Sequence, residues 1–160
     1  MKLKSYIDSI EDFPSKGILY RDIQPLLNDS RAFEDAIQGM VDLIDIENVE
    51  YFAGIESRGF IFGTAMSWIT NKGFKMIRKP GKLPGKILSI DYDLEYGSNT
   101  LEMQPGDGKV IIVDDVLATG GTINAAKQLA TNAGYQVVDL LCLLDIGLLK
   151  EHNIKCLISY

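Results

Sequence analysis

The sequence predicts an α/β fold in which a doubly wound, mainly parallel sheet is flanked by helices. Two short runs, 51–55 and 110–113, are apolar throughout and lack the alternation typical of a half-exposed strand. We expect both to be buried on both faces, as in a parallel sheet. Each run is followed by a polar, glycine-containing turn and then by apolar residues at helical spacing. Strands that alternate with helices in this way favour parallel pairing through crossover helices.

The N-terminal segment is predicted to hold one short helix and a loop. Leu3, Ile7 and Ile10 recur at helical spacing, which predicts an amphipathic helix. The segment 11–22 that follows contains Pro14 and a glycine, both turn-forming, ahead of three apolar residues. We expect a surface loop with a hydrophobic centre.

A helix, a strand and a second helix come next. The polar run 28–30 consists of N-cap residue types, and apolar residues follow it at helical spacing up to Ile44. The strand 51–55 ends at a polar turn that contains Gly59, and a helix is expected around 62–69.

A basic segment then interrupts the alternation of strands and helices. After a short strand at 75–77, the residues 78–86 include two prolines, two glycines and four cations, which exclude a helix and favour a mobile loop. The alternating segments 88–92 and 100–103 predict a hairpin. The whole segment 78–103 is interpreted either as a lid or as a plain solvated loop.

The strand 110–113 leads into the segment with most chemical information. We expect it to stop at Asp114 and Asp115, at the carboxyl end of a strand, where open α/β sheets bind ligands. The small residues 118–122 follow and precede a helix around 125–133, so that backbone amides can converge on an anion such as phosphate. A tight turn with two solvated aspartates is the alternative.

Two strands complete the prediction. Gly134 is a natural helix C-cap residue, the apolar residues of 135–144 predict a strand, and 155–160 predicts an edge strand. Internal repeats and low-complexity segments are absent. A length of 160 residues predicts one domain over residues 1–160.

Composition limits the classes of partner. With 46% hydrophobic residues the chain can bury a sizeable core, and 16 basic against 22 acidic residues give a net charge of −6. That charge argues against a duplex-binding surface, so nucleic acid is not expected as a partner. The N-terminus lacks the apolar core of a signal peptide, and no run approaches about 18 uninterrupted apolar residues. We expect a cytoplasmic protein without a membrane partner.

Cysteine and histidine offer little for catalysis. Cys142 and Cys156 stand in apolar stretches without a CxxC pairing, which predicts reduced core cysteines. His152 is the one histidine, which leaves little basis for a histidine zinc site or a Ser-His relay.

The paired carboxylates Asp114 and Asp115 have metal binding or general acid–base chemistry as alternatives to ligand binding.

Five ordered motifs resemble the type I phosphoribosyltransferases, and among them the adenine phosphoribosyltransferases. They are FPxxGxxxRD at 13–22, GIESRGF at 54–60, RKPGKLPG at 78–85, LEYG at 94–97 and VDDVLATGGT at 113–122. The resemblance covers nearly the whole chain. It implies a type I phosphoribosyltransferase-like fold with a small N-terminal hood, residues 1–27, and a mobile hairpin lid, residues 78–103.

The resemblance also implies an activity and a set of site residues. The activity is transfer of the 5-phosphoribosyl group from 5-phosphoribosyl-1-pyrophosphate (PRPP) to adenine, which gives AMP and pyrophosphate in purine salvage. The implied residues are Ala118, Thr119, Gly120, Gly121 and Thr122 for the 5′-phosphate, Asp114 and Asp115 for the ribose, Ser57, Arg58, Arg78, Lys79 and Lys82 for the pyrophosphate, Leu19, Arg21 and Val116 for adenine, and Glu95 with Arg58 for catalysis. Glu95 would act on the proton of the incoming purine as a general base or acid.

Magnesium bound with PRPP, rather than a metal held directly by side chains, and a homodimer are further implications of the resemblance. Tyr20 stands where many relatives have phenylalanine. Two alternatives remain: a phosphoribosyltransferase for another base (xanthine, hypoxanthine or orotate), and a non-catalytic PRPP- or nucleotide-sensing protein of the same fold. The hood motif argues against the first, and the lid with Glu95 argues against the second.

Overall fold

The computed structural model describes residues 2–94 and 97–160, and its contacts divide the chain into two compact units, 1–39 and 40–160. The helix α2 (Ser30–Asp42) crosses the boundary between them. Each unit has secondary structure of its own.

In the first unit, the 3-10 helix η1 (Leu3–Tyr6) is followed by β1 (Asp8–Ile10), which pairs antiparallel with β2 (Tyr20–Asp22). The predicted amphipathic helix is therefore wrong beyond Tyr6, and the predicted loop ends in a strand. Helix nucleation costs free energy, so a segment this short forms a helix only weakly. Hydrogen bonds between its backbone and β2 stabilise it more than the helical spacing of three apolar side chains does.

Two helices complete this unit, α1 (Gln24–Asn28) and most of α2. The side chain of Asp29 caps α2, because its Oδ1 accepts hydrogen bonds from the backbone N–H of Arg31 at 3.0 Å and of Ala32 at 2.9 Å. The predicted helix start in the polar run 28–30 is confirmed.

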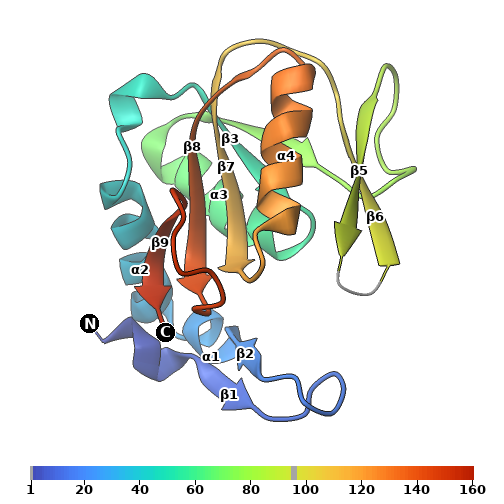
Figure 1. Ribbon diagram of the computed structural model, residues 1–160. Helices are drawn as coiled ribbons and strands as arrows, with labels where there is room; N and C mark the ends of the chain where they lie inside the picture. The colour runs from blue at the N-terminus through green and yellow to red at the C-terminus, as the bar shows by residue number, and fades with distance from the viewer. Residues whose placement is uncertain (1, 95–96) are drawn as a thin grey trace. The chain divides into compact units, whose positions relative to one another are not determined.

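The second unit is built on a five-stranded sheet with the order β4-β3-β7-β8-β9. Every neighbouring pair is parallel, and Figure 1 shows the arrowheads of β7, β8 and β9 at the same end. This confirms the predicted mainly parallel sheet and its edge strand. The elements are the 3-10 helix η2 (Ile46–Asn48), β3 (Tyr51–Ile55), β4 (Gly73–Ile77), β7 (Lys109–Leu117), β8 (Gln136–Asp145) and β9 (Lys155–Ser159).

Helices α3 (Arg58–Thr70) and α4 (Gly121–Asn132) cover opposite faces of this sheet (Figure 1). The helix α3 joins β3 to the outer strand β4, whereas α4 joins β7 to β8 in the other direction. Right-handed crossovers that run in opposite directions place their helices on opposite faces, which makes the sheet doubly wound. On one face Ala126 and Leu129 of α4 pack in a cluster with Ile112 of β7.

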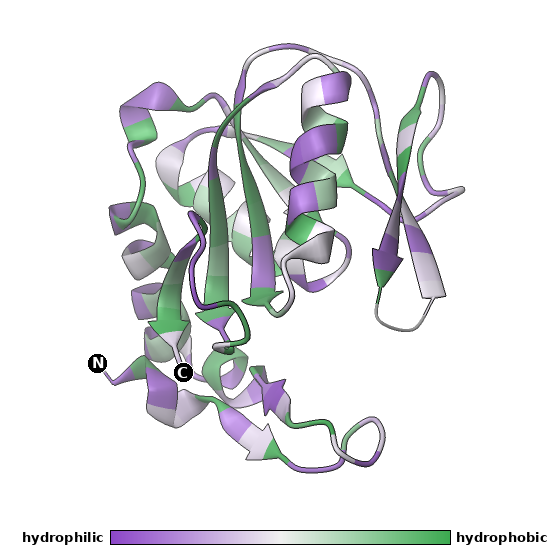
Figure 2. Ribbon diagram, in the orientation of Figure 1, coloured by the Kyte–Doolittle hydropathy of each residue, from purple (hydrophilic) through white to green (hydrophobic). Residues whose placement is uncertain are grey.

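The strand β7 is longer than predicted. Its register with β8 continues through Asp114↔Cys142 and Val116↔Leu144, so Asp114 and Asp115 lie within the strand rather than beyond its end. The ten-residue β8 keeps supplying backbone partners, and this outweighs the low β-propensity of aspartate. Figure 2 shows β7 as mostly hydrophobic with a hydrophilic band near its carboxyl end.

The predicted hairpin is also present. β5 (Leu88–Leu94) and β6 (Gly97–Met103) pair antiparallel, and Figure 1 shows them beside α4. Leu101 and Met103 are buried in the same cluster as the apolar side chains of α4. The base of the hairpin is therefore part of the core.

In the described ranges, 2–94 and 97–160, no helix is long and apolar enough to cross a membrane. The helices α2 and α3 have 13 residues each, whereas a membrane-spanning helix needs about 20.

Candidate active site

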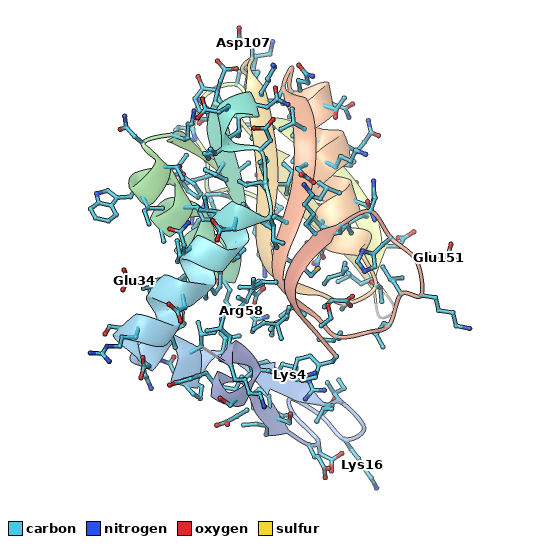
Figure 3. All side chains as sticks on the ribbon, turned by 90° about the vertical axis from the view of Figure 1, so that its left-hand side faces the viewer. Lys4, Lys16, Glu34, Arg58, Asp107 and Glu151 are labelled. Atoms are coloured by element: carbon cyan, nitrogen blue, oxygen red, sulfur yellow. The ribbon has the colours of Figure 1, made fainter. Side chains whose placement is uncertain are left out.

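The central strands β3 and β7 are neighbours, and the strand order changes direction between them. Such a reversal in an open parallel sheet forms a crevice at the carboxyl ends of the strands. Arg58 follows β3, whereas Asp107 precedes β7, and Figure 3 shows these two residues at opposite ends of the sheet. Arg58 therefore marks the end at which a ligand would bind.

A pocket of about 230 Å³ lies at this end. The residues predicted to bind the sugar and the phosphate line this pocket together with Arg58, which follows β3. Its lining consists of Arg58, Asp114, Asp115, Val116, Leu117, Ala118, Thr119, Gly120, Gly121, Thr122 and Ile123.

The loop that ends this lining turns directly into α4. Gly120 is the N-cap residue of the helix and has a φ of 85°, in the left-handed region that favours glycine. A Cβ atom at Gly120 would lie 3.1 Å from Nδ2 of Asn124 and 3.2 Å from Cδ1 of Leu149. Glycine at this position thus allows successive backbone N–H groups to lie at the N-terminus of α4. This end of the helix dipole is positive and attracts anions.

The carboxylate of Asp115 faces the guanidinium of Arg58, with 2.8 Å between Asp115 Oδ2 and Arg58 Nε. The side chain of Asp115 is 5% exposed and that of Arg58 is 43% exposed. Among the described residues, Asp115 Oδ2 has no partner with the alignment of a hydrogen bond. A buried oxygen in this state has remaining capacity to accept a hydroxyl proton of a ligand.

The pKa values of the two neighbouring carboxyl groups are raised to different extents. Burial raises the pKa of Asp114 well above its ordinary value, and the negative charge of Asp115 raises it further. Burial also raises the pKa of Asp115, but the positive charge of Arg58 opposes this. Asp114 is therefore the member of the pair that takes up a proton first, while Asp115 stays paired with Arg58.

Gly59 allows the turn after β3 to approach β7. A Cβ atom at this position would lie 2.7 Å from the carbonyl oxygen of Val113 and 3.1 Å from Oδ1 of Asp114. No side chain fits at these distances, so glycine is required beside Arg58. The sequence signal is the glycine of the GIESRGF motif, which by its residue type alone predicts only a polar turn.

Glu56 organises the start of the basic segment, a role that sequence reasoning missed. Its Oε1 accepts hydrogen bonds from Nη2 of Arg78 at 2.7 Å and from Nε at 3.2 Å, and its Oε2 accepts one from the backbone N–H of Lys79 at 2.8 Å. The N–H of Lys79 lowers the pKa of Glu56 most, with the adjacent Arg78 adding to the effect. Arg78, predicted to face pyrophosphate, thus has a carboxylate partner in this structure.

The sequence is similar to those of known proteins. A model of the phosphoribosyl transferase domain matches residues 26–159. A curated adenine phosphoribosyltransferase of Halothermothrix orenii is 48% identical over 155 residues, which cover 94% of this chain and 91% of the relative. The chain belongs to the adenine phosphoribosyltransferase family.

Solved structures of this family have the same fold. The adenine phosphoribosyltransferase of Thermoanaerobacter pseudethanolicus superposes with a TM-score of 0.91 at 38% identity, covering 99% of this chain and 98% of that one. The adenine phosphoribosyltransferase of Saccharomyces cerevisiae, complexed with D-2,5-dideoxy-2,5-imino-altritol 1,6-bisphosphate and adenine, superposes with a TM-score of 0.88 at 32% identity, covering 97% of this chain and 94% of that one. The predicted family and type I fold are confirmed.

The adenine-side residues that the resemblance to adenine phosphoribosyltransferases implied lie in different units. In the first unit, Leu19 lines a pocket of about 210 Å³ together with Glu11, Asp12, Gly17 and Ile18. In the same unit Arg21 Nη1 donates to Oγ of Ser9, which joins β2 to β1. In the second unit, Val116 lines the pocket of the carboxylates.

The remaining residues implied by the adenine phosphoribosyltransferase motifs lie outside the lining of the carboxylate pocket. Ser57, Lys79 and Lys82 are exposed. Glu95, the predicted catalytic carboxylate, lies outside the described residues. In the described part of the hairpin, the hydroxyl of Thr122 donates to Oη of Tyr92 at 3.5 Å, so β5 reaches the loop 118–122.

Proposed function

We propose that this protein transfers the 5-phosphoribosyl group of PRPP to adenine and releases AMP and pyrophosphate. The observation that carries the proposal is the single pocket in which the segment 118–122, the carboxylates of Asp114 and Asp115, and Arg58 meet. PRPP has a 5′-phosphate, a ribose diol and a 1′-pyrophosphate, and these three groups of residues match those three parts by charge and hydrogen-bonding type. The curated relatives of the same family support adenine as the acceptor.

The 5′-phosphate binds the loop Ala118–Thr122. Backbone N–H groups before α4 and the hydroxyls of Thr119 and Thr122 donate to its oxygens, and the helix dipole adds about 0.3–1 kcal/mol. Because this group is remote from the reacting carbon, its binding energy positions the sugar for the chemical step.

The ribose hydroxyls bind Asp114 and Asp115. A carboxylate accepts charge-assisted hydrogen bonds, which are stronger than neutral ones. The buried Oδ2 of Asp115 points to one such acceptor site. Binding of the diol compensates part of the cost of burying two carboxyl groups side by side.

The leaving pyrophosphate is stabilised by Arg58 and Ser57, with Arg78, Lys79 and Lys82 of the lid contributing further positive charge. Arg58 is already fixed toward Asp115, so its orientation costs little during the reaction. As the glycosidic bond breaks, positive charge develops on the ribose and negative charge on pyrophosphate. Preorganised charges that match this separation lower the barrier.

Magnesium would enter with the pyrophosphate. Among the described residues no group of three or more His, Cys, Asp or Glu side chains could hold a metal ion by itself, whereas the oxygens of Asp114 and Asp115 line the pocket and suit a hard cation. When bound, the ion neutralises the charge of the pyrophosphate. The residues Asp114 and Asp115 would hold the ribose hydroxyls beside it.

Adenine recognition is assigned to Leu19 and Arg21, and to Val116. Glu95 is assigned the transfer of the proton of the incoming purine. The other common group for this role is histidine, and the one histidine of the chain, His152, already contacts Asp145. A lid at 78–103 would exclude water from a site in which PRPP can be hydrolysed. The hood at 1–27 and this lid would act within one domain of residues 1–160.

A homodimer and a cytoplasmic location complete the proposal. The exposed side of α3 and the adjoining strand β4 carry large apolar side chains, and Trp68 is 86% exposed. Several exposed large apolar side chains on neighbouring elements favour a subunit interface. The other exposed apolar residues there are Ile61, Ile69 and Met76. We expect Trp68→Glu to shift the protein from dimer to monomer in analytical ultracentrifugation; a wild-type monomer would refute the dimer.

The activity is tested by supplying magnesium and PRPP with adenine, hypoxanthine, xanthine or orotate in turn, while pyrophosphate and nucleotide are quantified. We expect turnover with adenine alone. A preference for another base would refute the adenine assignment, and PRPP binding without turnover on any base would indicate a sensor.

The sugar assignment has its own test. The double variant Asp114→Asn with Asp115→Asn should fold and lose PRPP affinity in calorimetric titration. Unchanged affinity would refute the assignment of these two residues to the ribose.

A further inference from the structure

The two cysteines face each other across neighbouring strands. Cys142 of β8 is the register partner of Cys156 of β9, in a parallel pair. Neighbouring strands lie about 4.8 Å apart, and side chains at paired positions leave the sheet on the same face. This spacing falls inside the range of about 4.4–6.8 Å between Cα atoms that a disulfide bond requires.

The surroundings of the two thiols confirm that they share a face. Cys142 is 0% exposed and belongs to the cluster between the sheet and α4, and Cys156 packs against the same cluster. Cys156 is partly exposed, and its Sγ lies 3.9 Å from the carbonyl oxygen of Ile154. Cys142 is thus enclosed in the core, whereas its neighbour Cys156 is only partly buried.

The two thiols also differ in acidity. A hydrogen bond from the Cys142 thiol lowers the pKa of Cys156, while burial and the nearby Asp145 oppose this effect. The same hydrogen bond raises the pKa of Cys142, and burial and the charges of Asp114 and Asp115 raise it further. The accessible thiol is therefore the one that ionises, as in pairs of an attacking and a resolving cysteine.

We propose that Cys156 and Cys142 form a reversible thiol–disulfide site, in which Cys156 reacts with a low-molecular-weight disulfide and Cys142 resolves the product. The proposal does not depend on the transferase activity. It differs from the sequence-based expectation, which treated each cysteine as an isolated core residue because pairing across two strands 14 positions apart has no local signal.

The reaction balances in two exchanges. The thiolate of Cys156 attacks one sulfur of the small disulfide, forms a mixed disulfide and releases one small thiolate. Cys142 then loses its proton and attacks Sγ of Cys156, which forms the bond between the two cysteines and releases the second small thiolate. The protein loses two electrons and two protons, and the small disulfide is reduced to two thiols.

The internal disulfide would fasten the edge strand β9 to β8. The closed loop contains residues 143–155, including the segment between the two strands. Cross-linking restricts the unfolded chain, so oxidation is expected to raise the unfolding temperature.

The test treats the folded, full-length protein with oxidised glutathione and follows its intact mass under denaturing, non-reducing conditions. The wild type should lose the mass of two hydrogens without retaining glutathione, stay unchanged in oligomeric state, and return to its original mass with dithiothreitol. Cys142→Ala should accumulate a glutathione adduct on Cys156, because no resolving thiol remains. Cys156→Ala should react at least about tenfold more slowly, since its remaining thiol is buried.

Circular dichroism before and after treatment shows whether each variant is folded. The proposal is overturned if the folded wild type keeps both thiols, if it retains glutathione as a stable adduct, if it cross-links between chains, or if Cys156→Ala reacts as fast as the wild type. Alanine variants that do not fold would leave the wild-type mass result to decide.

Discussion

The guanidinium Nε of Arg58 lies 2.8 Å from Oδ2 of Asp115, and this contact joins the turn after β3 to the carboxylate pair of β7. The two residues are 57 positions apart in the sequence. Arg58 precedes Gly59, Asp115 follows Asp114, and Gly59 packs closely against Asp114. The contact fixes a cation over a buried acid at the reversal of strand order. The fold itself therefore holds a positive and a negative group together at this end of the sheet.

Arg58→Ala should lower kcat/KM for PRPP by about 10²-fold, since it removes a preorganised cation from the leaving group. Arg58→Lys should recover only part of the loss, because an ammonium group lacks the planar fork of guanidinium. Steady-state kinetics measures both. Lys127→Ala, at an exposed position of α4, is the matched control and should keep wild-type activity; equal losses in the Lys127 and Arg58 variants would contradict a specific role.

Asp114→Asn should raise the unfolding temperature at pH 7 while weakening PRPP binding. The raised pKa of Asp114 means that the folded chain holds this proton more tightly than the unfolded chain, whose pKa is near 3.8. Stability from this group is therefore full below that pH and is lost as the pH rises through the raised pKa. Thermal melts from pH 4 to pH 8 should show a smaller decline in the variant than in the wild type.

The exposed Glu34→Gln variant serves as the control for the removal of one negative charge. It should leave the pH dependence of the melts as in the wild type. A decline of equal size in the wild type and in Asp114→Asn would show that burial of this carboxyl group is not costly.

Gly59→Ala should destabilise the fold by about 1–3 kcal/mol, since the added methyl group would meet the carbonyl oxygen of Val113. The displacement would also move Arg58, so activity should fall with stability. Chemical denaturation measures the free energy of unfolding. Gly121→Ala is the control for stability, because its Cβ atom would have only ordinary contacts of 3.7 Å; a loss as large in this variant would argue against a specific clash.

Glu56→Gln should weaken the contacts to Arg78 and to the backbone of Lys79, because the amide keeps one acceptor oxygen and carries no charge, and should cost about 1 kcal/mol of stability. The lowered pKa of Glu56 means that its contribution is present above pH 4.5 and is lost as the pH falls through the folded-state value. Acid titration of the unfolding temperature should therefore be shallower below pH 4.5 in the variant.

Glu102→Gln is the companion variant for this comparison. Glu102 accepts a hydrogen bond from the N–H of Gly81 at 2.7 Å but, among residues 2–94 and 97–160, has no side-chain partner comparable to Arg78. We expect a smaller loss of stability in chemical denaturation than with Glu56→Gln. The opposite order would show that the anchor at Glu102 positions the basic segment.

Local patterns predicted most of the second unit correctly. The apolar runs 51–55 of β3 and 110–113 of β7 favour burial between two layers of helix, and Gly120 with its small neighbours favours a turn into a helix N-terminus. These are properties of a few adjacent residues. The same kind of pattern failed for η1 and β1, because pairing with β2 provided backbone partners that spacing alone does not reveal.

The sequence by itself determined the parallel sheet, the glycine-containing loop before α4 and the acidic pair, since each depends on residue types within one short segment. Only the tertiary structure decided how Arg58 pairs with Asp115, how Glu56 holds Arg78, and that Cys142 faces Cys156. The physical reason is that these contacts depend on strand order and register, which bring together residues distant along the chain. Burial, which raises the pKa values of Asp114 and Asp115, is likewise created only when the sheet and its helices pack.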